Sequence, residues 1–344
     1  MHLSTLLPLG TIFFKHWHTD DSEVGVAVAK AQFEIREDGT LKSVKPGPEL
    51  EMSDVFAAEV ATSRLLMEQE IAPAKVATDL TMNAVAHAPG GKPAQDWEVS
   101  VNIPDRLHYA CRVRGPTLWS RGVMGWSLSD PEPVSQVPLT YDLAYGGPAQ
   151  GDPDAKTPDI YDLNPAGQGY ATKESLEGKQ SFAAAQIGNI AEFMIKDPLA
   201  LLTVHGFGPV AKAWLPRRVH AGTFDEDWES TRHPRMPEDY DLRFWNAAPH
   251  ALQIEPMLEG TETIHLDGMT EGGGRRSLTL PGVKLMLAAE GENVSKNHTM
   301  KLDTLHIDVA DPDPAQHRVT LVWRTLVTGP ERFTSGQLQS VKIG

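Results

Sequence analysis

The chain has 344 residues, with 31 Lys and Arg against 46 Asp and Glu, so its formal net charge is −15 at pH 7. Nucleic acids and anionic membranes bind basic surfaces, so this balance argues against both as partners. The single Cys111 excludes an intramolecular disulfide framework and multi-cysteine metal sites. Residues 3–14 are apolar but have no basic start and are too short for a membrane span of about 20 residues. We therefore expect a cytoplasmic protein.

The first third of the sequence predicts β-strands. Residues 11–17 and the alternating stretch 24–35 precede an Asp38-Gly39 turn and a return over 41–44, which predicts a hairpin. Between Ser53 and Glu70, apolar residues with acidic spacers predict a short helix capped by Ser53 or Asp54. Gly- and Pro-rich turns then separate short apolar runs, a pattern typical of an antiparallel sandwich or barrel. These runs cover residues 77–86, 97–103, 107–113 and 137–145.

The second half of the sequence has a loop-rich start and then more strands. Residues 146–178, rich in Gly, Pro and Asp, predict a long ordered loop or linker. Residues 180–195 predict a partial helix, and residues 214–249 lack a period and are expected to wrap over a sheet. Strands are predicted again over 262–266, 276–280, 283–289, 302–309 and 319–327, with the last two forming a second hairpin.

Together these elements predict a mainly β fold with few short helices. We expect antiparallel sandwich or barrel-like halves at 1–178, which includes the acidic loop, and at 179–344. Both halves are expected to belong to one unit.

One glycine motif suggests a cofactor. Gly206-Phe-Gly208-Pro-Val-Ala211 follows an apolar run and matches a dinucleotide-binding fingerprint. Pro209 and Pro216 would break the helix whose amides must hold the pyrophosphate, so a structural turn is the favoured interpretation. We expect no cofactor.

Two further candidate sites are a histidine pair and the single cysteine. His16 and His18, with Asp20 or Asp21, have a spacing suited to a metal, but no second histidine cluster can be placed near them. Polar residues on an edge strand are the favoured interpretation, and no metal is expected. Cys111 lies in an apolar strand, where a buried thiol is favoured over a nucleophile.

The carboxylates of the 225–241 region leave two interpretations open. They could supply an acid and a base for glycoside hydrolysis, or they could form a structural ion network with neighbouring arginines, which we favour. The carboxylates are Asp225, Glu226, Asp227, Glu229, Asp239 and Asp241, and the arginines are Arg217, Arg218, Arg232, Arg235 and Arg243.

A series of short motif-like segments runs over nearly the whole chain. The segments are Ala77-Thr-Asp79, His87-Ala-Pro-Gly-Gly-Lys-Pro93, Gly115 to Trp119, Val137-Pro-Leu-Thr-Tyr141, Ala144-Tyr-Gly-Gly147, Asn164-Pro-Ala-Gly167, Ala221-Gly-Thr-Phe-Asp225 with Trp228, Asp241-Leu-Arg243-Phe-Trp-Asn-Ala-Ala-Pro249, and Trp323-Arg324. In this order they resemble the Domain of Unknown Function 2169 family, which is associated with bacterial type VI secretion loci.

The resemblance implies an adaptor or chaperone that binds a toxic effector before export and helps to load it onto the VgrG spike. Members of this kind are not enzymes, so no catalytic residue is carried over. The motif glycines are interpreted as turn residues, and Asn164 and Asn246 as side chains that bond local backbone in loops.

The acidity motivates a prediction about the effector. We expect a basic effector segment to dock on acidic surface clusters, and β-strand addition at a sheet edge is a second possible mode. The predicted contact residues are Asp152, Asp154, Asp225, Glu226, Asp227 and Glu229. The enzyme alternative is a carboxylate-based glycan hydrolase, which needs a cleft with two carboxyl groups about 5–10 Å apart. A structural component of the secretion machine is a third reading.

Overall fold

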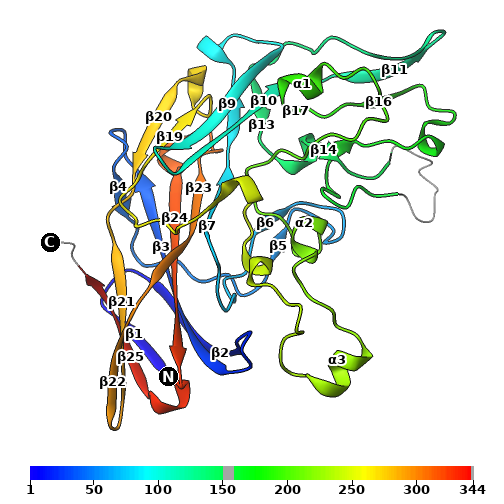
Figure 1. Ribbon diagram of the computed structural model, residues 1–344. Coiled ribbons are helices and arrows are strands. Elements are labelled where there is room, and N and C mark those ends of the chain that lie inside the picture. The colour runs from blue at the N-terminus through cyan, green and yellow to red at the C-terminus, as the bar shows by residue number, and fades with distance from the viewer. Residues whose placement is uncertain (150–158, 342–344) are drawn as a thin grey trace.

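A computed structural model of the chain describes residues 1–149 and 159–341, and the part that it describes is mainly β with three short α-helices (Figure 1). The predicted fold class is therefore confirmed. Within the described residues the sheets are open and none closes into a barrel, so the architecture is sandwich-like. No helix of the described residues is long and apolar enough to cross a membrane.

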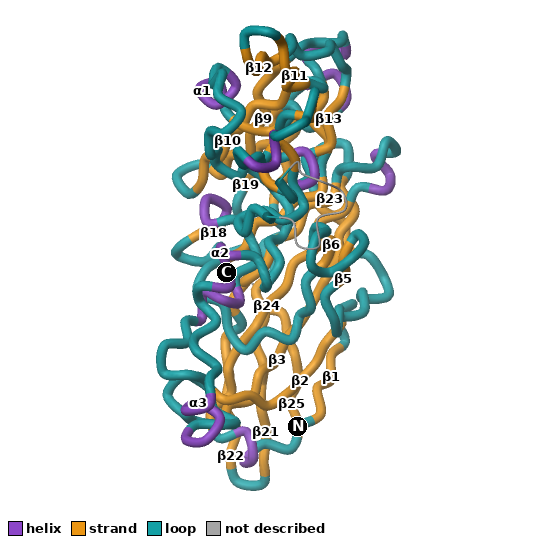
Figure 2. Tube along the Cα trace, turned by 90° about the vertical axis from the view of Figure 1, so that its right-hand side faces the viewer, coloured by secondary structure: helices purple, strands orange, loops and turns teal. Residues whose placement is uncertain are grey.

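A seven-stranded sheet forms the centre of the molecule (Figures 1 and 2). Its neighbours pair antiparallel except β7 and β23, which are parallel. Strands from both expected halves contribute to it. In spatial order they are β18 (Gln253–Ile254), β7 (Thr78–Asn83), β23 (Lys301–Asp308), β24 (Arg318–Thr328), β3 (Glu23–Ile35) and β2 (Gly10–Trp17), with β4 (Leu41–Ser43) also paired to β3. Both predicted hairpins are confirmed, as β3–β4 and β23–β24.

Strict alternation gives this sheet two different faces, because successive side chains of a strand point to opposite sides. On β3, Ala29, Ala31 and Phe33 are buried in the main core, whereas Lys30 and Gln32 point to the other side. The same alternation holds on β7, β23 and β24. One face of the sheet is thus apolar. The other is polar around Lys30 and Gln32 but carries a small apolar cluster at Val26, Val28 and Val322.

Two further sheets cover the apolar face and share a single core with it. The five-stranded sheet contains β17 (Ile187–Gly188), β10 (Leu107–Arg114), β9 (Asp96–Ile103), β19 (Thr263–Asp267) and β20 (Arg275–Thr279). The four-stranded sheet contains β1 (His2–Thr5), β25 (Ser335–Val341), β21 (Lys284–Gly291) and β22 (Val294–Thr299). Val99, Leu266 and Leu287 are fully buried representatives of this core.

A small sheet at one end of the molecule carries a projecting hairpin (Figures 1 and 2). It contains β12 (Gly125–Leu128), β11 (Leu118–Gly122) and β16 (Ser181–Ala183), and α1 (Ile190–Phe193) follows it in the chain. Trp119 stacks on Phe182 in its own small core. We call β11, β12, β16 and residues 189–202 the hairpin end.

Short strand pairs complete the fold. β8 (Val85–His87) pairs with β13 (Gln136–Pro138), and β14 (Tyr145–Gly146) pairs with β15 (Gln168–Gly169). The run 137–145 is therefore not one strand, because a 3-10 turn at Tyr141–Leu143 divides it.

The helix predicted over 53–70 is wrong. This region forms β5 (Val55–Phe56) and β6 (Leu65–Met67), which pair antiparallel. The Asp54 carboxylate accepts a hydrogen bond from the distant Gln69 N–H at 2.9 Å, so it does not cap a helix. Leu65 is buried against Tyr141 and Trp214, a tertiary contact that overrides the local pattern.

The helix predicted over 180–195 shrinks to the four residues of α1. Residues before Asn189 form β16 and β17, and Asn189 and Glu192 then make a reciprocal capping box. The region 214–249 contains α2 (Leu215–Arg218) and α3 (Glu226–Thr231). It reaches the seven-stranded sheet at Asn246, which hydrogen-bonds to Asp79 of β7 and to Ala77, the residue before that strand.

Candidate functional site

The acidic residues predicted to bind a partner surround α3 or fall outside the described residues. Asp225 is the N-cap of α3 and accepts a hydrogen bond from Trp228 N–H at 2.9 Å, and Glu226, Asp227 and Glu229 occupy the first turn. In the described part of the chain none of these four makes an ion pair. Asp152 and Asp154 lie outside the described residues. The α3 carboxylates thus form an exposed acidic patch, and their partner role stays a prediction.

The predicted arginine network is correct only at Asp241, the one predicted carboxylate that pairs with these arginines in the described part of the chain, and most of the arginines' partners lie outside the 217–243 region. Arg243 pairs with Asp241, as expected within the region. Arg217 instead pairs with Glu68, Arg218 with Asp162, and Arg232 with Asp21. The network therefore ties this region to three other parts of the chain.

The other candidates from the sequence are the histidine pair, the glycine motif and Cys111, and their contacts are those of structural residues. His16 Nδ1 lies 2.6 Å from the carbonyl oxygen of Trp17, and among the described residues no group of three or more His, Cys, Asp or Glu side chains is placed to hold a metal. Residues 206–211 contain no helix, and Phe207 of this segment is fully buried. Cys111 is buried, and burial raises the pKa of its thiol to about 12, which makes it a poor nucleophile.

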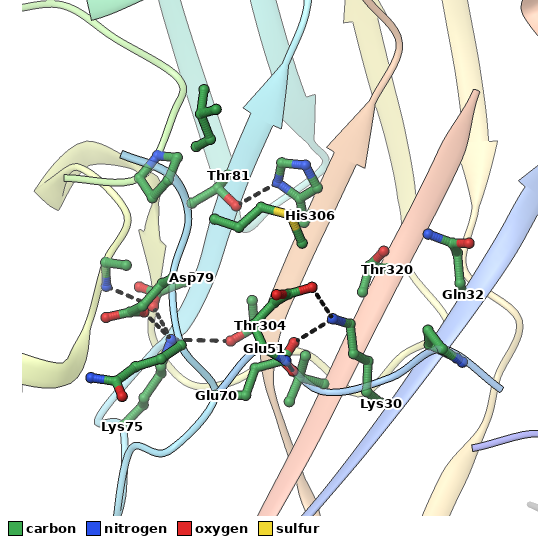
Figure 3. Close-up of a pocket in the computed structure, with 18 of the residues that line it drawn as sticks. Lys30, Gln32, Glu51, Glu70, Lys75, Asp79, Thr81, Thr304, His306 and Thr320 are labelled. Carbon is green, nitrogen blue, oxygen red and sulfur yellow. Dashed lines mark hydrogen bonds and ion pairs between the residues drawn. The ribbon is translucent and has the colours of Figure 1, made fainter. Parts of the chain in front are cut away.

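A cavity of about 240 Å³, lined by many charged and polar side chains, lies on the face of the seven-stranded sheet that carries Lys30 and Gln32 (Figure 3). Its roof is formed by residues 48–70, which we call the cap, together with Pro209 and Ala247. The cap has two limbs, residues 48–54, which we call the outer limb, and residues 66–70, which we call the inner limb. They lie side by side, because the Glu70 N–H bonds the Glu51 carbonyl and the Glu51 N–H bonds the Glu70 carboxylate, each at 2.8 Å.

The cavity floor consists of two rows of side chains that cross four strands. The strand registers place Asp79, Thr304, Val322 and Lys30 in one row. The second row is Thr81, His306, Thr320 and Gln32. Each row takes one residue from β7, β23, β24 and β3, in that order.

A buried ion network occupies the first row and its surroundings (Figure 3). Lys75 Nζ lies 2.8 Å from Asp79 Oδ2, 3.2 Å from Glu68 Oε2 and 3.2 Å from Thr304 Oγ1, so all three of its donors have partners. Asp79 is fully buried and also accepts hydrogen bonds from Asn246 Nδ2 and from two backbone N–H groups of residues 247–248. This satisfies a carboxylate that would otherwise be costly to bury.

Glu68 links the network to the 210–217 region. Arg217 Nη2 lies 2.5 Å from Glu68 Oε1, and Lys212 Nζ lies 3.8 Å from the same oxygen. Burial alone would raise the pKa of Glu68, but Lys75, Arg217 and Lys212 outweigh it and hold the pKa at about 2. Burial would likewise lower the pKa of Lys75, yet its carboxylate neighbours raise it above the ordinary value. Both groups are therefore charged at neutral pH.

Two more cations fix the cap to the sheet. Lys30 Nζ lies 2.9 Å from Glu70 Oε1 and 3.9 Å from Glu51 Oε1. Arg324 pairs with Asp303 at 2.6 Å and donates to the backbone carbonyls of Glu70 and Ala72. Burial raises the pKa of Glu70, although Lys30 opposes that effect.

The second row of the floor is neutral. His306 Nδ1 lies 2.9 Å from Thr81 Oγ1, and burial lowers the pKa of the imidazole, which keeps it uncharged at pH 7. The side chains of Gln32 and Thr320 line the cavity, and neither hydrogen-bonds another side chain or backbone group among the described residues.

The hairpin end presents a different kind of surface. Val123 and Met124, at the turn between β11 and β12, are fully exposed. Leu118, Ile190, Met194 and Leu201 are also exposed large apolar side chains of this end. Residues 196–199 line a shallow hollow together with Arg121 and Trp126, which places them beside the hairpin.

The sequence contained some of the signals for the cavity. Asp79, Asn246 and Arg324 fall within the segments that carry the family resemblance, but these segments were interpreted as serving the fold and not a binding site. The expectation that Asn164 and Asn246 bond local backbone is wrong. Asn246 contacts residues about 170 positions earlier, and Asn164 Nδ2 donates to the carbonyls of Tyr141 and Tyr145.

Comparison with known proteins identifies a family. A model of the family described as "Uncharacterized protein conserved in bacteria (DUF2169)" matches residues 20–324. Searches of curated proteins and of solved structures gave no match. Because the family model spans most of the chain and includes the cap, the cavity floor and the hairpin end, the protein belongs to the DUF2169 family.

Proposed function

We propose that this DUF2169 protein is a non-catalytic type VI secretion adaptor, which binds a toxic effector in the bacterial cytoplasm and promotes its loading onto the VgrG spike. The observation that carries the proposal is the turn of the projecting hairpin, where two neighbouring large apolar side chains, Val123 and Met124, are fully exposed. Apolar surface that a soluble protein exposes in this way is a candidate for burial in a protein partner.

The hairpin end suits a protein contact because its base is rigid and its tip is apolar. Trp119, Trp126 and Phe182 pack together beneath the hairpin, so the projecting turn has a fixed support. Val123 and Met124 at the tip can be buried in a partner without disturbing the core of this chain. Methionine adapts its shape to irregular apolar surfaces, which favours this use.

The proposal is tested by capturing partners from a lysate of the source bacterium and then reconstituting the complex from purified chains. Mass spectrometry of the bound proteins is expected to identify a toxin and a VgrG protein. The double variant V123S/M124S is expected to lose at least tenfold in affinity for the toxin. The matched control L6S/V219S, which changes two other exposed apolar side chains, is expected to bind normally.

A separate variant tests whether the acidic patch on α3 contacts the effector. Changing Glu226, Asp227 and Glu229 to their amides removes three charges from α3 and leaves the Asp225 cap in place. If the α3 patch holds a basic segment of the effector, this variant weakens binding at low salt more than at high salt. Unchanged binding at both salt concentrations would remove α3 from the contact surface while leaving the hairpin end in it.

One observation favours the glycan hydrolase alternative. Glu51 and Glu70 share Lys30 at the cavity, and the raised pKa of Glu70 resembles that of a general acid. The alternative predicts turnover of a polysaccharide such as peptidoglycan, and loss of that turnover in Glu70→Gln. Such a result, without recovery of a toxin or VgrG protein, would replace the adaptor proposal. Stoichiometric presence of the chain in the secreted spike would instead indicate a structural component.

A further inference from the structure

The charged groups that line the cavity do not cancel completely. Lys75 and Arg217 neutralise Asp79 and Glu68, as described above, and Arg324 neutralises Asp303. Lys30 lies close to Glu70 and 3.9 Å from Glu51.

Two carboxylates of the cap remain after this pairing. Glu51 has only the distant contact with Lys30, and Glu49 has no ion-pair partner in the part of the chain that the structure describes. Both line the cavity, and both belong to the outer limb of the cap. The cavity therefore has an excess negative charge at its roof.

The rest of the lining combines neutral polar groups with apolar ones. Gln32 and Thr320 offer an amide and a hydroxyl from the floor without a described partner for either. Pro48, Leu66 and Met67 contribute apolar surface at the roof. The volume of about 240 Å³ is far larger than the roughly 10–15 Å³ that one water needs.

We propose that this cavity binds a lysine or arginine side chain of a protein partner, with its cationic head group near Glu49 and Glu51. The aliphatic stem of such a side chain would contact the apolar roof, and its head group would meet the carboxylates of Glu49 and Glu51 and the neutral polar floor. An inorganic cation has no aliphatic part, so it would make no favourable contact with the apolar roof. This inference rests on the proposed function in one respect, namely that the partner is a protein.

Methionine methyl groups provide a reporter for this binding. The chain contains 11 methionines, of which Met67 lines the cavity and Met124 lies at the tip of the hairpin. In protein labelled with ¹³C-methyl methionine, the Met67 signal is assigned by the variant Met67→Leu. The probe is the capped pentapeptide Ala-Ala-Lys-Ala-Ala, and the comparison peptides carry Gln or Glu at the centre.

The lysine peptide is expected to shift the Met67 signal to saturation and to leave Met124 unchanged, and the Gln and Glu peptides are expected to shift neither. The variant E49Q/E51Q should weaken the lysine peptide at least tenfold. The control E226Q/D227N makes the same change in net charge on α3 and should alter the affinity less than twofold. Glu49→Gln and Glu51→Gln are also measured singly, so that a fold defect of the double variant does not decide the result.

Several results would overturn the inference. They are a Met67 signal that does not move, equal effects of the Lys and Gln peptides, or equal weakening by the cavity and α3 variants. Saturation by spermidine but not by the peptide would show that a free polyamine is the ligand, which also contradicts the proposal. If the pull-down still recovers a toxin in these cases, the adaptor function stands and only the cavity assignment fails.

Discussion

Replacing Glu68 by Gln removes the carboxylate that joins three cations beneath the cap. Glu68 is largely buried and contacts Lys75, Arg217 and Lys212. Removing one partner from a buried ion network leaves uncompensated charge and costs about 3–5 kcal/mol. Lys75 retains Asp79 and Lys212 retains Asp54, so we expect a loss near the lower end, about 3 kcal/mol at pH 7.

The depressed pKa of Glu68 gives a second estimate of how much this carboxylate contributes to the free energy of unfolding. The pKa of Glu68 falls from 4.5 to about 2 on folding, and each unit corresponds to about 1.4 kcal/mol, which gives about 3 kcal/mol. Because the folded-state pKa is depressed, this stabilisation is complete above pH 4.5 and is lost as the pH falls toward 2. The free-energy gap between wild type and Glu68→Gln should therefore be constant from pH 7 to about 4.5. It should narrow by about 1 kcal/mol between pH 4.5 and pH 3.5.

Urea denaturation followed by tryptophan fluorescence at several pH values measures this gap. The control is Glu292→Gln, an exposed residue for which the described residues offer no ion-pair partner, where we expect a change within about 0.5 kcal/mol. The reasoning is refuted if Glu68→Gln costs no more than the control, or if the gap does not narrow between pH 4.5 and 3.5.

Three further predictions concern other parts of the molecule. Asn246→Ala removes two buried hydrogen bonds, to Ala77 and Asp79, and a partly buried one from Val76, so unfolding experiments should show a loss of about 3 kcal/mol in the free energy of unfolding. A loss below about 1 kcal/mol would contradict this geometry. V123S/M124S should change the free energy of unfolding by less than about 0.5 kcal/mol, since both side chains are exposed, and a larger loss would mean that the tip packs on the protein itself. Cys111 should react with a thiol reagent only when the chain is unfolded in urea, and rapid labelling of the native protein would show that the thiol is accessible.

The strands of the central sheet were predictable because each carries its own two-residue period. Residues 29–35 and 304–309 alternate apolar and polar side chains, and residues 24–28 and 319–327 do so only loosely. A half-buried strand is the structure that uses such alternation. The same sequences also show that these strands carry polar side chains on one face. They do not show which strands are neighbours, so the two rows of the cavity floor could not be assembled without the structure.

The cap was mispredicted because its conformation depends on distant contacts. Leu65 packs against Tyr141 and Trp214, and Arg217 reaches Glu68 across 149 positions of the sequence. A local helical pattern contains no information about such pairs. For the same reason, the arginines were expected to pair with carboxylates close in the sequence. Arg217, Arg218 and Arg232 instead pair with carboxylates in other regions of the chain.

The ion network explains how a cavity can persist under a cap that has little regular structure. Lys30, Lys75 and Arg324, anchored on or beside the sheet, hold the inner limb of the cap at Glu70 and Glu68, and Lys212 holds the outer limb at Asp54. A roof fixed in this way is formed before any ligand arrives, so binding would not have to order the cap. The buried charges thus position the cap. Glu49, which has no ion-pair partner among the described residues, and Glu51, which has only the 3.9 Å contact with Lys30, are left to determine what the cavity accepts.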